Sequence, residues 1–383
     1  MSRRKMTLGI ATVQDIDKTS DNSRLGTCGL IKWCYSMHHL VSQPYLQGLA
    51  QLIVLTNDGT AVRSLCVPDM QSQLRIISLD PMLNVLIANW TQMLNLAQLS
   101  FSWTRQLTLR ALFKLQLFRL TEYRAILFTD VDADPFLPST GRPPTARMKV
   151  GHRDNKYREM ERAWTRSLGR FLYSPKQLIA SSDWSSPINT GVMLLKPRLS
   201  TFDEGVSVLR RGQFHPLFGF DRVGRPREAL AHLTREVVWP GIMRTNMFRK
   251  NDWNFIGGHA DQGLFVYLFL VRNGARRFEF PRNVSFRKQH NLSTMKIHHF
   301  HSGTKPWRRH ARCPMYLSFM NHADARPTSH KKEFCWRLLT EKFYCLRDGL
   351  TTDACRECRR SRQASLCDGR KKLLCEGTEV VVF

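Results

Sequence analysis

Apolar positions in the first 130 residues follow two different periods along the chain. Residues 7–12 and 51–58 are short apolar runs that predict strands, and residues 29–40 between them predict a helix. Residues 105–120 carry apolar side chains three and four positions apart, which predicts a second helix directly before a buried strand at 125–128. This order of strand, helix and strand predicts an α/β domain with a mainly parallel sheet, in which ligands bind beyond the carboxyl ends of the strands.

The elements expected after residue 150 are more scattered. Residues 192–195 predict another buried strand, whereas residues 199–250 are rich in arginine and are expected to be loops with short helices. A helix is expected to begin near the start of 261–270, and residues 296–302 alternate between apolar and polar like a strand.

Beyond about residue 311 the chain changes character. Residues 330–346 predict an amphipathic helix, and seven of the ten cysteines lie in the last 71 residues. Such crowding is typical of disulfides in an oxidising compartment or of a metal site. We therefore expect a main domain over residues 1–310 and a small, basic, cysteine-rich appendage over residues 311–383.

The charge of the chain favours anionic partners. Lys and Arg number 58 against 31 Asp and Glu, which gives a net charge of +27. Nucleotides, acidic glycans, anionic membrane surfaces and nucleic acids are the candidate partners of such a protein. The basic residues are spread along the chain without a known nucleic-acid-binding motif, so nucleic acid is the least favoured of these. No apolar run is long enough to predict a transmembrane helix, and the first residues show no signal-peptide pattern.

Candidate chemistry begins where the apolar run of AILFTDVDADPFLP ends in three aspartates at every second position. On an extended strand Asp130, Asp132 and Asp134 would share one face about 7 Å apart, and each neighbouring pair would repel by roughly 2 kcal/mol. Such repulsion predicts a bound cation, although a solvated turn is the plain alternative. The glycine and glutamate of a calcium-binding EF-hand loop are absent from their positions, so Mg²⁺ or Mn²⁺, which also bind substrate phosphates, fits better.

Four segments together resemble glycosyltransferase family 8, the glycogenin-like enzymes. The segment KLQLFRLTEYRAILFTDVDAD (114–134) is similar to the family signature that ends in D-x-D. INTGVMLLKP (188–197) resembles the N-[ST]-G-V strand, and HADQGLF (259–265) resembles the start of the D-Q helix. HHFHSGTKPW (298–307) resembles the terminal H-F-x-G-x-x-K-P-W loop. The four motifs follow the family order over about 190 residues, whereas the first 100 residues match only loosely.

The resemblance implies a GT-A fold, a Rossmann-like nucleotide-sugar-binding domain. It also implies retaining transfer of a hexose or hexuronic acid from a UDP-sugar, with Mn²⁺ or Mg²⁺ as cofactor. The metal ligands that it implies are Asp130, Asp132 and His299. The residues that it places on the donor are Lys114, Asp130, Asp132, Asn189, Gly191, Gly303 and Lys305. The residues that it places at the sugar and the reacting carbon are Asn189, Asp261 and Gln262.

The resemblance leaves several choices open. Asp261 could act as a nucleophile, or the acceptor could attack from the face of the leaving group. His298 and His301 compete with His299, which the register of the Lys-Pro-Trp loop selects. Gly258 stands in place of a family acid and Val266 in place of a common asparagine, which puts the donor sugar in doubt.

Other functions and two cellular locations remain open as alternatives. The chain could be a catalytically inactive GT-A-fold protein that binds a glycan or nucleotide, or, less favoured, a basic nucleic-acid-binding protein. The acceptor, whether glycan, lipid or protein, is not identified, and basic charge could bring the chain to a membrane surface. Golgi or another secretory lumen is expected from the family and the cysteines, with the cytoplasm as the alternative. In the tail, Cys355, Cys358, Cys367 and Cys375 are expected to form disulfides rather than a zinc site, because the second pair is irregularly spaced; free thiols are a further alternative.

Overall fold

The computed structural model describes the central part of the chain. The described residues are 6–14, 29–30, 33–34, 37, 40–41, 46, 48–65, 73–96, 109–134, 168–182, 186–233, 242, 245–280, 289–292 and 295–299. The predicted appendage over residues 311–383, its helix and its cysteines lie outside the described residues, as do Gly303 and Lys305.

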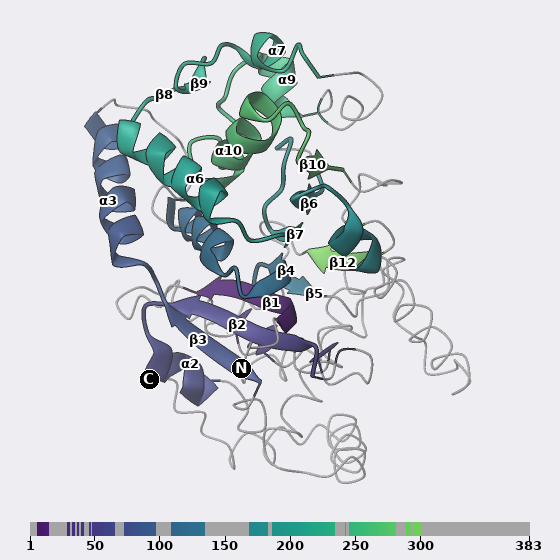
Figure 1. Ribbon diagram of the computed structural model, residues 1–383. Coiled ribbons are helices and arrows are strands. Elements are labelled where there is room, and N and C mark those ends of the chain that lie inside the picture. The colour runs from purple at the N-terminus through teal and green to yellow at the C-terminus, as the bar shows by residue number, and fades with distance from the viewer. Residues whose placement is uncertain are drawn as a thin grey trace, which may run out of the picture.

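A seven-stranded sheet forms the centre of the fold (Figure 1). Its strands are β1 (Met6–Gln14), β2 (Ala50–Thr56), β3 (Leu74–Ser78), β4 (Tyr123–Thr129), β6 (Leu178–Ala180), β7 (Val192–Leu195) and β10 (Phe278–Glu279), in the spatial order β10-β6-β7-β4-β1-β2-β3. Only β7 among these runs antiparallel to its neighbours, β4 and β6. The prediction of an α/β domain with a mainly parallel central sheet is therefore confirmed.

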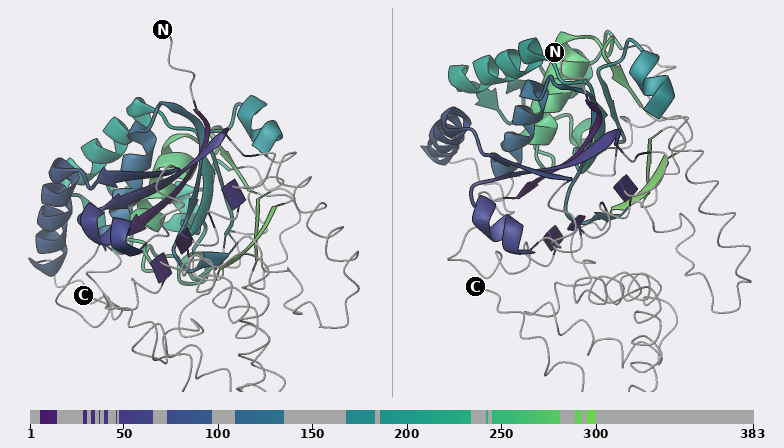
Figure 2. Two further views of the ribbon diagram at one scale, coloured as in Figure 1. Left: turned by 90° about the horizontal axis from the view of Figure 1, so that it is seen from below. Right: turned by 60° about the horizontal axis from the view of Figure 1, so that its bottom comes forward.

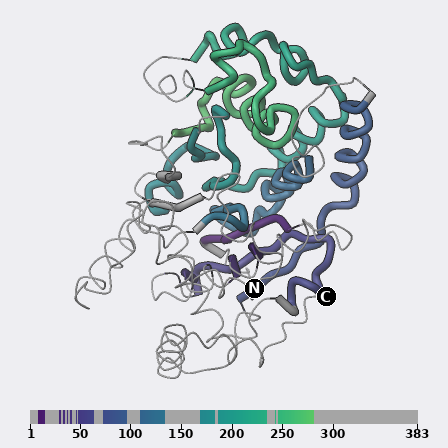
Figure 3. Tube along the Cα trace, turned by 180° about the vertical axis from the view of Figure 1, so that it is seen from behind, coloured from purple at the N-terminus to yellow at the C-terminus, as the bar shows by residue number. Residues whose placement is uncertain are grey.

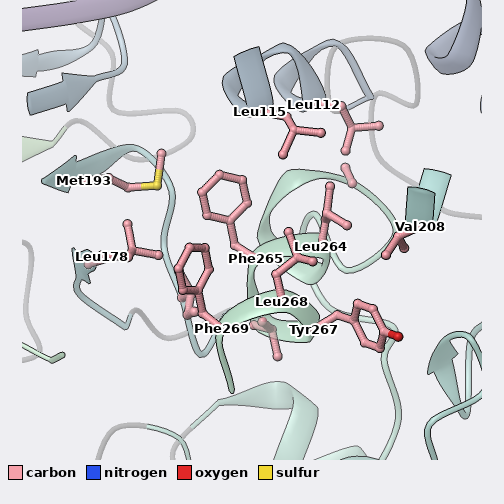
Figure 4. Packing of buried hydrophobic residues seen from close by; sticks show 14 of the residues in the cluster. Leu112, Leu115, Leu178, Met193, Val208, Leu264, Phe265, Tyr267, Leu268 and Phe269 are labelled. Atoms are coloured by element: carbon pink, nitrogen blue, oxygen red, sulfur yellow. The ribbon is translucent and has the colours of Figure 1, made fainter. Parts of the chain in front are cut away.

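The larger helices lie together on one face of this sheet. The helical elements are α2 (Gly59–Leu65), α3 (Pro81–Leu96), η2 (Ala111–Arg119), α6 (Leu199–Arg211), α7 (Pro226–Ala229), α9 (Asn246–Lys250), α10 (Asp261–Val266) and the π-helical η3 (Tyr267–Arg272). Figure 2 shows α3, η2, α6 and α10 together on one side of the strands, and Figure 3 shows α3 along the outer edge of this layer. Leucine and phenylalanine side chains of η2 and α10 pack between the layers with β6 and β7 (Figure 4).

Smaller elements complete the described part. Strands β8 (Phe214–His215) and β9 (Gly219–Phe220) form a short antiparallel hairpin. Strands β5 (Ala133–Asp134), β11 (Gln289–Leu292) and β12 (Met295–His299) form a separate antiparallel sheet in the order β11-β12-β5. The described residues within 29–41 are helical and buried, as the sequence predicts for 29–40.

The helix predicted at 105–120 differs from expectation. Its main part, η2, is a 3₁₀ helix, and residues 112–118 are all buried. A three-and-four spacing predicts one buried face, but η2 packs against β1, α3, α6 and α10 and is therefore enclosed on several sides. Apolar spacing alone could not reveal these extra neighbours.

The expectation of mainly irregular structure over 199–250 is wrong at its start. Helix α6 occupies Leu199–Arg211, and its buried face includes Phe202, Val206 and Leu209. These residues have helical spacing, but the surrounding arginines obscure it. Gly212 ends the helix in a left-handed conformation, with φ of 63°, which glycine adopts without steric cost.

Replacement of Gly205 by alanine is expected to destabilise the domain, because α6 lies closest to η2 at this residue. A Cβ atom at Gly205 would lie 2.5 Å from Leu115 Cδ1, and Leu115 is fully buried. We expect Gly205→Ala to lower the free energy of unfolding by about 1–3 kcal/mol in urea titrations.

Gly169 offers a matched control for this substitution. It lies in the helical residues 168–173, and a Cβ there would meet nothing within 4 Å. Gly169→Ala is expected to leave stability unchanged or raise it by up to about 1 kcal/mol. Equal effects of the two substitutions would contradict the close packing of α6 on η2.

Candidate functional site

The direction of β7 brings two of the sequence motifs to one edge of the sheet. Asp130 follows the carboxyl end of β4, and Gly191 precedes the amino end of β7. Because β4 and β7 are antiparallel, with Thr129 opposite Val192, these two ends meet. The Asp130 amide donates a hydrogen bond to the Gly191 carbonyl at 2.7 Å. The D-x-D segment and the N-T-G segment are therefore joined through their main chains.

The aspartates do not continue the strand, which corrects the expectation of one extended acidic face. β4 ends at Thr129, and residues 130–132 turn before β5 begins. The Ala133 amide donates a hydrogen bond to the Asp130 carbonyl at 2.9 Å, which closes the turn. Asp residues favour turns because their short side chains can hydrogen-bond nearby backbone groups. The side chain of Asp130 is 34% exposed, whereas Asp132 is buried.

Lys114 lies at the centre of the site. Its Nζ is 3.1 Å from Asp130 Oδ1 and 3.0 Å from Asp261 Oδ2. It also donates to the carbonyl and the hydroxyl oxygen of Thr190, both at 3.2 Å. The lysine side chain is 6% exposed and lies over the Phe128 ring, 4.9 Å from its centroid. One buried ammonium group thus connects residues of the D-x-D, N-T-G and D-Q segments.

The electrostatic balance keeps Lys114 charged. Burial by itself lowers the pKa of a lysine, but attraction by Asp130 and then by Asp261 outweighs it, so the pKa of Lys114 is raised above its ordinary value. Two carboxylates around one ammonium leave a local excess of negative charge. The centre can therefore hold a further cation at its more exposed side, where Asp130 lies.

Asp261 is the first residue of α10, where a negative charge is favoured by the helix dipole. It is 3% exposed, and the Thr190 hydroxyl donates a hydrogen bond to its Oδ2. The helix begins in a crowded loop, because a Cβ atom on Gly258 would lie 2.1 Å from the Trp253 carbonyl oxygen. This backbone leaves no room for a side chain larger than that of glycine at residue 258.

Asn189 and Gln262 are close to this centre in sequence but have different surroundings. Asn189 is buried, and its Oδ1 accepts a hydrogen bond from the Gly191 amide at 2.8 Å, so it shapes the turn before β7. Gln262 Oε1 is buried and has no hydrogen-bond partner within the described part of the chain. A buried acceptor of this kind is unusual in proteins and suits a donor group of a ligand.

The backbone of β12 runs beside the aspartate turn. In its antiparallel pairing with β5, His299 is opposite Ala133 and His298 is opposite Asp134. The residue 299 backbone is thereby placed next to the D-x-D segment. Among the residues whose side chains the structure describes, no three His, Cys, Asp or Glu side chains gather into a ready metal cluster. Lys305 and Gly303 remain sequence predictions.

Thr190 and Trp33 are site residues that the sequence alone did not identify. Thr190 contacts both Lys114 and Asp261, and its position inside the N-[ST]-G-V motif was the available signal. Trp33 Nε1 donates a hydrogen bond to Thr129 Oγ1 at 2.7 Å, which anchors the end of β4 directly before Asp130. Trp33 gave no such signal, since its partner is 96 residues away in the sequence.

Comparisons with known proteins match this chain to solved structures only. No protein-family model matches the chain, and no curated protein matches it. The chain is similar to apo mouse xyloside xylosyltransferase 1, at 10% identity over 71% of this chain and 84% of that one, with a TM-score of 0.31. It is also similar to the galactosyltransferase LgtC in complex with donor and acceptor sugar analogs, at 12% identity over 90% and 96% of the two chains, with a TM-score of 0.36. The chain is likewise similar to an active-site mutant of LgtC, at 12% identity over 79% of this chain and 90% of that one, with a TM-score of 0.33.

Loss of the Lys114 charge is expected to destabilise the protein strongly. In Lys114→Met the buried carboxylate of Asp261 loses its counter-ion, which should lower the free energy of unfolding by about 3–5 kcal/mol at neutral pH. The pKa of Lys114 is raised in the folded state, so its charge stabilises the fold. This contribution to the free energy of unfolding is fully present below about pH 10 and is lost as the pH rises further. In urea titrations from about pH 7 to pH 11, the free energy of unfolding should therefore fall less in the variant than in the native protein.

Lys250→Met is the matched control for this prediction. Lys250 is an exposed lysine at the end of α9. Its removal should change stability by less than about 0.5 kcal/mol and leave the alkaline loss intact. A Lys114 variant as stable as this control would contradict the central role of the buried ammonium.

Proposed function

We propose that the protein is a metal-dependent, retaining glycosyltransferase of the GT-A type that transfers a hexose or hexuronic acid from a UDP-sugar. The observation that carries this proposal is the bridge made by Lys114 between Asp130 and Asp261, with Thr190 as its third partner. Three of the four family-like segments, which are distant in sequence, meet at this one ammonium group. They meet at the edge of the sheet where α/β proteins bind ligands.

The donor set at the aspartate turn fits a divalent metal. Asp130 is accessible, Asp132 lies two residues away in the same turn, and the backbone of β12 brings residue His299 alongside. Two carboxylates with one imidazole suit Mn²⁺, and carboxylates with water suit Mg²⁺. Asp130, Asp132 and His299 would hold the ion, which when bound offsets the negative charge that develops on a departing diphosphate.

Lys114 acts on the reaction through the carboxylates that it holds. Its ammonium group has three N–H donors, and four acceptor atoms of Asp130, Asp261 and Thr190 lie within 3.2 Å. It therefore orients the acid on the metal side and the acid on the sugar side. Lys305, with Gly303, is proposed to reach the phosphates directly.

Asp261 and Gln262 are proposed to face the transferred sugar. The ion pair with Lys114 and the hydrogen bond from Thr190 fix the position of the Asp261 carboxylate. A fixed carboxylate can stabilise positive charge at the anomeric carbon or attack that carbon, so the geometry supports both routes to retention. The buried Oε1 of Gln262 would accept a hydrogen bond from a sugar hydroxyl, with Asn189 shaping the adjacent turn.

A secretory compartment such as the Golgi is the proposed location. Cys34, buried in the helical residues within 29–41, is disulfide-bonded. Structural disulfides persist in oxidising compartments and are rare in the cytosol. In the described residues no helix has the length and apolar character needed to cross a membrane.

Removal of either proposed metal-binding carboxylate is expected to abolish turnover without unfolding the protein. Asp130→Asn and Asp132→Asn should each reduce Mn²⁺-dependent hydrolysis across a panel of UDP-sugars by at least about 100-fold. Asp134→Asn is the matched control and should retain most of the activity. Native protein that binds UDP and Mn²⁺ but turns over no donor would instead be a binding protein, which would contradict the proposed enzyme.

The terminal motif is tested by binding rather than turnover. His299→Ala should weaken Mn²⁺ affinity by about 10–100-fold, whereas His298→Ala should change it little, because the side chains of successive strand residues point to opposite faces. Lys305→Ala should weaken UDP binding measured by calorimetry. A UDP affinity that is indifferent to Lys305 would count against the assignment of the whole terminal loop.

A further inference from the structure

A second concentration of charge lies at the end of the central sheet opposite the candidate site. The site is at the Thr129 and Val192 ends of β4 and β7, whereas this second region surrounds the start of β4, the starts of β6 and β10, and the Leu195 end of β7. We call it the basic end. Its members are Arg124, Arg170, Lys176, Lys196, Arg198, Arg276 and Arg277.

Hydrogen bonds from lysine side chains to main-chain carbonyls hold the basic end together. Lys196 Nζ donates to the Ser174 carbonyl and lies over the Phe171 ring, 5.0 Å from its centroid. Lys176 Nζ donates to the carbonyls of Ala275 and Arg276 at 3.3 and 3.1 Å. The lysines thus connect the helical residues 168–173, the end of β7 and the start of β10. Their positions are therefore set by the fold.

No carboxylate balances these charges within the described part of the chain. None of the seven side chains forms an ion pair there, whereas Arg75, Arg119, Arg211 and Arg272 elsewhere each pair with an acid. Burial, followed by repulsion from Arg198 and Arg124, lowers the pKa of Lys196. Like charges held together without acidic partners cost stability, so a fold that keeps them is suited to an external anion.

Two exposed apolar side chains flank the basic end. Tyr173 is 84% exposed and immediately precedes Ser174, whose carbonyl binds Lys196. Leu199 is 53% exposed and immediately follows Arg198. Tyr173 is the only aromatic residue among the exposed large hydrophobic residues of the described part of the chain. Tyrosine and leucine beside arginine are suited to the headgroup region of a membrane, where the apolar groups enter and the cations remain at the surface.

We propose that the basic end is a docking surface for an anionic lipid membrane. A polyanionic glycan would match the cations, but it would not explain why Tyr173 and Leu199 are exposed beside them. Docked in this way, the candidate site would face away from the membrane, at a distance of about the length of β4, roughly 20 Å. The proposal does not rest on the glycosyltransferase assignment, because it concerns the other end of the sheet.

Vesicle sedimentation with the full chain tests the proposal. The native protein should bind phosphatidylcholine vesicles that contain about 30% phosphatidylserine much more tightly than vesicles of phosphatidylcholine alone, and high salt should weaken the binding. Each cation near such a surface contributes about fivefold in affinity. Arg124→Glu with Arg198→Glu should therefore weaken binding by at least about 20-fold.

Arg222→Glu with Arg227→Glu is the matched control, since it makes the same charge change at exposed residues near β9 and α7. This control should alter vesicle binding less than about threefold. Tyr173→Ser with Leu199→Ser should remove the part of the binding that persists at high salt. Circular dichroism and urea unfolding would establish that each variant is folded.

Several outcomes would overturn the membrane proposal. If the two charge-reversal variants lost vesicle affinity equally, only the net charge of the protein would matter. If the native chain did not bind the vesicles at all, the proposed surface would be rejected. Binding to heparin but not to vesicles, lost in the Arg124 and Arg198 variant, would assign the basic end to an anionic glycan instead. None of these outcomes depends on transferase activity, so they are separable from a failure of the proposed function.

Discussion

The structure around the candidate site depends on a single buried ammonium group. Lys114 lies on the 3₁₀ helix η2, almost without solvent exposure, and contacts two carboxylates from distant parts of the chain. Neither Asp261 nor Lys114 could be buried alone without a large desolvation penalty. Together they are satisfied, and the enclosure of η2 by its neighbours is what brings the lysine to the sheet edge.

The reversed direction of β7 explains how distant motifs share this edge. In a wholly parallel sheet the N-T-G segment before β7 would lie at the opposite end from the D-x-D segment after β4. Because β7 is antiparallel to β4, Asp130 and Gly191 are joined by a main-chain hydrogen bond, and Thr190 reaches Lys114 and Asp261. One exception to the parallel pattern therefore assembles the site.

The same sheet separates two kinds of electrostatic environment. At one end two carboxylates exceed the single positive charge of the lysine that they surround, so a further cation can be accommodated there. At the other end two lysines are held by main-chain carbonyls, and neither they nor the arginines beside them have an acid as partner among the described residues. The charge of the described residues is thus not evenly spread, and the two ends suit ligands of different kinds.

Local patterns in the sequence determined the α/β class, the strands at β2, β4 and β7, and the start of α10 at Asp261. These follow from short-range periodicity and from residue chemistry, which a sequence displays directly. They also determined the motifs that suggest Asp130, Asp132, Asn189 and Asp261. Contacts between elements decided three other features. These are the turn at the aspartates in place of an acidic strand face, the helix α6, and the enclosure of η2. Only the tertiary structure could place Lys114 between Asp130 and Asp261, or pair Trp33 with Thr129, because partners so far apart in sequence meet through packing alone.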